Sequence, residues 1–171
     1  MSTEPTGTRE SRGETSYLVY TRTFRAPITD VWAAVTEPAR LGRWIGTWSG
    51  DPASGQVDFR MTAEDPEAKA EAYQIDACEP PRRLALRHQF AGDEFVWRLE
   101  LDLAETNGVT TLTFAQVMDD PEIAENVGPG WDYYLDRLVA AETGTDVAAL
   151  AWDDYYPAQA DYYRGVFARA T

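Results

Sequence analysis

Most of the chain between residues 17 and 118 alternates apolar and polar positions as β-strands do. The β-forming run from Tyr17 to Phe24 ends at Ala26-Pro27, where proline removes a backbone donor. Five later runs follow the period-two pattern of strands with one covered face and one wet face. The turn residues Gly92-Asp93 and Asn107-Gly108 separate the last three. The pattern predicts an antiparallel meander with strands near 17–24, 57–61, 73–77, 84–90, 95–103 and 112–118.

Three segments show helical spacing instead. Pro27 suits a first helical turn, and it is followed by apolar residues at the spacing of one buried face: Ile28, Val31, Trp32 and Val35. A shorter apolar stripe restarts after Pro38. A long helix is predicted from Trp131 to the stop at Gly144, after a loop that contains Gly128-Pro129-Gly130.

The two ends of the chain differ in composition. Residues 1–14 are polar and lack periodicity, so we expect a disordered tail. Residues 145–171 carry too many aromatic side chains for a free tail, and we expect an extension that packs on the 15–144 domain, with a helix near 158–168. The prediction is therefore one α+β domain with two appended segments.

Composition narrows the choice of partners and compartment. The 171 residues contain 29 acidic and 15 basic side chains, a formal charge of −14, which disfavours nucleic acid and anionic membranes. Without a leader-like or membrane-spanning apolar run, we expect a cytoplasmic protein with no membrane insertion. The single cysteine, Cys78, cannot form an internal disulfide. A monomer and a homodimer both stay open.

Three strings, in this order, resemble a known family. They are FRAPITDVWAAVTEPARLGRW at 24–44, EPPRRL at 79–84 and GWDYYLDRL at 130–138. They are similar to the START-like (SRPBCC) superfamily, in the branch named after the activator of the heat-shock-protein-ninety ATPase. The resemblance implies a helix-grip fold: a curved antiparallel sheet of six to seven strands, two short helices after strand one, and a long C-terminal helix across the concave face. The superfamily includes lipid carriers, hormone receptors and polyketide cyclases.

A hollow between the sheet and the long helix is the expected site. Aromatic side chains from several segments converge there in such a fold, and they suit flat apolar ligands, although tryptophans also fill ordinary cores. We predict no cofactor and no metal, because nucleotide and EF-hand spacings are absent. The candidate ligand-binding residues are Trp44, Trp48, Phe59, Tyr73, His88, Trp97, Phe114, Trp131 and Leu135.

His88 is the only histidine, so any histidine-based acid–base chemistry must use it. Alternation places it on the face of Leu84, Leu86 and Phe90, where it would act on a ligand or serve as a core residue. The offset of Asp132 and Asp136 from the apolar stripe predicts a solvent-facing edge and argues against paired-carboxylate catalysis.

Three functions remain open. The first is binding of a small hydrophobic or aromatic molecule without catalysis. The second is a cyclase or dehydratase in which His88 moves a proton. The third is an interaction protein that uses an aromatic patch between Trp152 and Tyr163.

Overall fold

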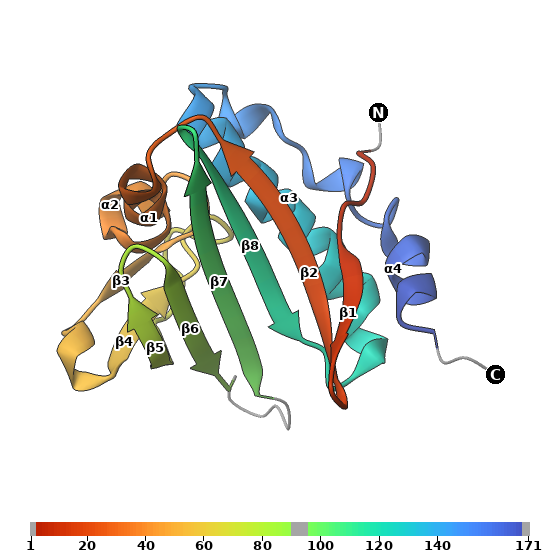
Figure 1. Ribbon diagram of the computed structural model, residues 1–171. Coiled ribbons are helices and arrows are strands. Elements are labelled where there is room, and N and C mark those ends of the chain that lie inside the picture. Colours follow the sequence, from red (N-terminus) through yellow and green to blue (C-terminus); the bar gives the residue numbers. More distant parts are fainter. Residues whose placement is uncertain (1–2, 90–95, 169–171) are drawn as a thin grey trace.

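A computed structural model of the chain describes residues 3–89 and 96–168, and it forms an α+β fold around one antiparallel sheet (Figure 1). The eight strands lie in the order β1-β2-β8-β7-β6-β5-β4-β3. Their bounds are β1 (Thr8–Arg12), β2 (Thr15–Phe24), β3 (Thr47–Ser49), β4 (Gln56–Arg60), β5 (Glu71–Glu79), β6 (Arg83–His88), β7 (Trp97–Thr106) and β8 (Val109–Val117).

Four α-helices accompany the sheet, and the long helix α3 runs along one face of it (Figure 1). The helices are α1 (Ile28–Thr36), α2 (Pro38–Leu41), α3 (Ala124–Thr143) and α4 (Ala160–Val166). Short 3-10 turns are η1 (Pro52–Ser54), η2 (Pro121–Ile123), η3 (Val147–Ala149) and η4 (Trp152–Asp154). The predicted helix-grip fold is confirmed, with two short helices after β2 and a long helix that ends at a left-handed Gly144.

The sheet has two more strands than the six that the alternation indicated. Strand β1 lies in the segment that we expected to be disordered, so that expectation was wrong for Thr8–Arg12. All five of its side chains are exposed at the sheet edge, and an edge strand without a buried face leaves no apolar period in the sequence. Strand β3 has only three residues, which is too short for a period to be read.

The predicted turn at Asn107-Gly108 is present, and both residues have the positive φ that a tight hairpin of this kind requires. The predicted turn at Gly92-Asp93 lies outside the described residues, as do Phe90 and Phe95.

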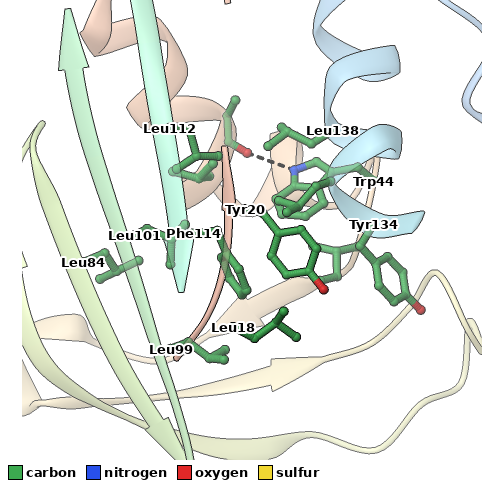
Figure 2. Close-up of a cluster of buried hydrophobic side chains, with 14 of the residues drawn as sticks. Leu18, Tyr20, Trp44, Leu84, Leu99, Leu101, Leu112, Phe114, Tyr134 and Leu138 are labelled. Atoms are coloured by element: carbon green, nitrogen blue, oxygen red, sulfur yellow. Dashed lines mark hydrogen bonds between the residues drawn. The ribbon is translucent and has the colours of Figure 1, made fainter. Parts of the chain in front are cut away.

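The core lies between the sheet and α3 (Figure 2). In antiparallel pairs, directly opposite residues point to the same face, so the register aligns Tyr20 with Phe114 and Phe114 with Leu101 on the face that α3 covers. On the side of the core opposite the sheet, Leu138 of α3 and Trp44 complete the hydrophobic layer. The alternation in the sequence therefore identified the covered face of the sheet correctly.

Helix α3 begins at Ala124, seven residues before the predicted start at Trp131. We expected a loop at Gly128-Pro129-Gly130, because glycine and proline are poor helix formers. Tertiary contacts overcome that preference here: Tyr20 Oη donates to the Gly128 carbonyl at 2.7 Å, and the ring of Tyr163 packs against the Gly128 backbone. The long helix thus covers more of the sheet than the sequence indicated.

Asp132 was predicted to face solvent, and the structure overturns this, since its side chain is 1% exposed. Arg22 of β2 donates to Asp132 at 3.0 Å and to Asp136 at 3.1 Å. The hydroxyls of Thr6 and Tyr163 also donate to Asp132. The physical reason is that Thr6 and α4 lie against this side of α3 and cover what would otherwise be an exposed edge.

The C-terminal segment packs on the rest of the fold. Helix α4 lies within the range 158–168 that the sequence suggested, and it contacts α3. Tyr155 and Tyr163 are core residues, whereas Trp152 and Tyr162 keep part of their surface in solvent. No helix in residues 3–89 and 96–168 combines the length and apolar character that a membrane crossing would need.

Candidate functional site

A cavity of about 180 Å³ lies between the sheet, α1, α2 and α3, and we refer to it as the inner cavity. Side chains from six strands face it, and none of its described lining residues is charged. They are Val35, Thr36, Leu41, Trp44, Ile45, Trp48, Pro52, Val57, Phe59, Met61, Tyr73, Ile75, Cys78, Leu84, Leu86, Leu99, Leu101, Phe114 and Trp131.

Three tryptophans of the inner cavity use their polar groups within the protein. Trp44 Nε1 donates to the Ala34 carbonyl at 3.1 Å, the bond drawn in Figure 2. Trp48 Nε1 donates to the Thr36 carbonyl at 2.7 Å. Trp131 Nε1 donates to Gln116 Oε1 at 2.6 Å, and its ring centroid lies 4.4 Å from that of Phe114. The carbon atoms of the indoles therefore face the cavity. A ligand there would make apolar contacts with these rings rather than hydrogen bonds.

Tyr73 of β5 is the most polar aromatic side chain in the lining. Its ring lies edge-on to Phe59 at 5.3 Å between centroids. Burial raises the pKa of its phenol, and the nearby carboxylates of Glu71 and Glu64 raise it further. The phenol therefore keeps its proton at neutral pH.

A second hollow of about 750 Å³, the outer groove, lies beside the first along the N-terminal half of α3. Four residues line both hollows: Met61, Tyr73, Leu99 and Trp131. The remaining lining residues are Ala63, Glu64, Trp97, Ile123, Asn126, Val127, Gly130, Tyr133, Tyr134 and Trp152. The two hollows are thus neighbours with a common wall.

Nine residues were predicted from the sequence to bind a ligand, and the structure places six of them around the inner cavity: Trp44, Trp48, Phe59, Tyr73, Phe114 and Trp131. Trp97 lines the outer groove instead. Leu135 and His88 line neither hollow. Leu135 is a fully buried core residue of α3.

His88 of β6 lies beside Tyr73 of β5, with the two rings stacked at 4.4 Å between centroids. The side chain is 2% exposed, and Nδ1 is 2.7 Å from the Ala72 carbonyl, so Nδ1 carries the proton in this contact. Its Nε2 lies 3.7 Å from Glu71 Oε2. His88 therefore does not line either hollow, and its contact with a ligand stays a prediction.

Sequence reasoning missed Cys78, which lines the inner cavity and is also exposed. Alternation from Tyr73 and Ile75 predicts that Ala77 faces inward. A β-bulge between Ile75 and Ala77 shifts the register, so that Cys78 pairs with Leu84 on the cavity side. No signal in the sequence marks a bulge at this place, and the exposed thiol lies where the cavity meets solvent.

Solved structures share this architecture. The crystal structure of CalU16 from Micromonospora echinospora matches with a TM-score of 0.73 at 24% identity, over 99% of this chain and 100% of that one. The solution structure of the product of gene BPP1335 from Bordetella parapertussis matches at 0.70 and 21%, over 96% and 94%. DynU16, a protein in the dynemicin biosynthetic locus, matches at 0.57 and 24%, over 75% of this chain and 48% of that one.

At 21–24% sequence identity, these structural matches establish the helix-grip fold but no shared function. No curated protein matches the chain. The family described as activator of Hsp90 ATPase homolog 1-like protein matches residues 25–142, a span that includes α1, α2, strands β3 to β8 and nearly all of α3. The chain belongs to this family.

Proposed function

We propose that the protein binds a small hydrophobic or aromatic molecule in the inner cavity and does not transform it. The observation that carries the proposal is the chemistry of the lining, in which aliphatic and aromatic carbon surrounds the space and the tryptophan N–H groups are already bonded within the protein. Such a cavity selects ligands by shape and by burial of apolar surface.

The size of the cavity sets the scale of the ligand. An apolar cavity of about 150 Å³ is known to bind benzene, so about 180 Å³ suits a group of one or two rings. Burying an aromatic group of about 150–250 Å² contributes roughly 4–6 kcal/mol at 25 cal/mol per Å². Association costs offset part of this, so we expect modest affinity unless a second contact adds to it.

Binding without chemistry is the better supported alternative, because the only histidine lines neither hollow and is 2% exposed. A proton shuttle needs a group within hydrogen-bond reach of the ligand. Among the described lining residues of the inner cavity, the titratable side chains are Tyr73 and Cys78, and burial raises the pKa of the Tyr73 phenol, which disfavours loss of its proton at neutral pH.

Filling the cavity tests the proposal directly. Ile75 lines the inner cavity, whereas its neighbour Gln74 is exposed on the opposite face of β5. Ile75→Trp places an indole in the ligand space, so we expect the affinity for butylbenzene to fall at least tenfold, about 1.4 kcal/mol. Gln74→Trp adds the same side chain outside and should leave the affinity unchanged. Protein-observed NMR titration measures both, with thermal unfolding to check that each variant is folded.

Equal affinity of the two variants for butylbenzene would contradict binding in the inner cavity. Failure of the wild-type protein to bind butylbenzene, or smaller probes such as toluene, would contradict the proposed function itself.

Cys78 provides an independent readout, because it is the only cysteine and lines the cavity at an exposed position. A ligand in the cavity should block access of a thiol reagent. With free butylbenzene at ten times its dissociation constant, we expect the labelling rate of Cys78 to fall about tenfold, in proportion to the empty fraction. Mass spectrometry measures the rate, and Ile75→Trp is the control in which the same butylbenzene concentration should lower the labelling rate by about twofold at most. Undiminished labelling in the wild type would place the ligand elsewhere.

A further inference from the structure

The outer groove differs in chemistry from the inner cavity. Six aromatic side chains line it: Tyr73, Trp97, Trp131, Tyr133, Tyr134 and Trp152. Glu64 is the only charged side chain among its described lining residues. Ring faces carry negative electrostatic potential and attract cations, and a carboxylate adds a full charge of the same sign. The groove is therefore built to favour a positive group.

Glu64 is held in place and still has capacity for a ligand. Tyr134 Oη donates to Glu64 Oε1 at 2.8 Å, which ties the 61–64 segment to α3 across the groove. An ionised carboxylate offers about four acceptor positions, of which this bond uses one. Because Glu64 is exposed, an incoming ammonium can reach its free positions without displacing Tyr134.

The wall of the groove already stabilises a cation at one point. The guanidinium carbon of Arg137 lies 5.3 Å from the ring centroid of Tyr133. Arg137 also donates to the Trp44 carbonyl at 2.9 Å and to Tyr133 Oη at 3.3 Å, and it is not a lining residue of the groove. Because Arg137 does not line the groove, no positive side chain among the described lining residues balances the negative charge of Glu64. The chain as a whole carries a net charge of −14.

The common wall joins this groove to the inner cavity. Met61, Tyr73, Leu99 and Trp131 face both hollows, and Met61 is a flexible side chain that can adapt its shape. We propose that the outer groove binds the ammonium head of an amphipathic ligand, between Glu64 and the aromatic rings, while the apolar body of the same molecule occupies the inner cavity. This inference rests on the proposed function and names the class of ligand: an aryl-alkyl amine.

Four probes with the same apolar body test it: butylbenzene, 4-phenylbutan-1-ol, 4-phenylbutylamine and 5-phenylpentanoate. At pH 7 the amine is an ammonium, as lysine is, and the acid is a carboxylate. We expect the amine to bind the full-length protein about tenfold more tightly than the alcohol, and the acid to bind most weakly. Calorimetric titration measures the three polar probes, and protein-observed NMR measures butylbenzene.

Two variants separate the effect of the Glu64 charge in the groove from the effect of the net charge of the chain. Glu64→Gln keeps an acceptor for Tyr134 and removes the charge in the groove, so the preference for the amine over the alcohol should shrink to the part that the aromatic rings supply, while butylbenzene still binds. Glu67→Gln removes one charge from an exposed residue that does not line the groove and should keep the preference.

Equal affinity of amine and alcohol in the wild type, or an undiminished preference in Glu64→Gln, would overturn the ammonium site and leave the inner cavity intact. If the wild-type protein did not bind butylbenzene, the proposed binding in the inner cavity would be refuted, and the ammonium site with it.

Discussion

Asp132→Ala is expected to lower the free energy of unfolding by about 3–5 kcal/mol, which is the range for breaking a buried ion pair from one side. The carboxylate of Asp132 is the acceptor for Arg22, Thr6 and Tyr163. Without it, the buried Arg22 guanidinium keeps only Asp136 as a charged partner, and two hydroxyls lose their acceptor. Urea denaturation followed by tryptophan fluorescence measures the loss.

Asp136→Ala is the matched control four residues along the same helix. Its side chain is 28% exposed, and its removal leaves the pair between Arg22 and Asp132 in place. Tyr155 Oη also donates to Asp136 at 2.7 Å, so two contacts are lost, and we expect a loss of about 1–2 kcal/mol, of the size found for partly exposed pairs and hydrogen bonds. If both variants lost the same stability, the special role of the buried carboxylate would be refuted.

Gly128→Ala is the second substitution with a large expected effect. A Cβ at this position would lie 2.1 Å from Cγ of Tyr163, so the ring must move or the helix must shift. Tyr163 cannot move freely, because its hydroxyl is bonded to Asp132 and accepts from the Gly7 N–H at 2.9 Å. We expect a destabilisation of about 1–3 kcal/mol, the usual cost of overpacking.

Gly130→Ala gives the opposite result on the same helix. A Cβ there meets nothing within 4 Å, and alanine favours the helix over glycine by about 0.5–1 kcal/mol. Thermal unfolding of the two variants should therefore shift in opposite directions. A rise in stability for Gly128→Ala would show that Tyr163 does not pack against α3 in solution.

The elements with a buried face were predictable from the sequence, and those without one were not. Strands β2 and β4 to β8 carry an apolar period, and so does the face of α3 that includes Leu135 and Leu138. Strand β1 is exposed on both faces and is held by its backbone ladder with β2. Residue-by-residue periodicity cannot detect a strand that buries nothing.

The candidate site was predictable in outline, because alternation and topology place aromatic side chains toward α3. The bulge that turns Cys78 inward was not, since it depends on pairing between β5 and β6. The burial of Asp132 also escaped prediction, because its partners Thr6, Arg22 and Tyr163 lie far from it along the chain. Long-range contacts of this kind leave no local pattern.

The hydrogen bonds between residues 3–7 and residues 159–163 have a consequence for biosynthesis. Gly7 N–H donates to Tyr163 Oη, and Gln159 Nε2 donates to the Thr3 carbonyl, each across 156 positions of the chain. During translation, Thr3 and Gly7 are made 156 positions before Gln159 and Tyr163, respectively. Thr3 and Gly7 therefore remain without these two hydrogen-bond partners until Gln159 and Tyr163 have been made.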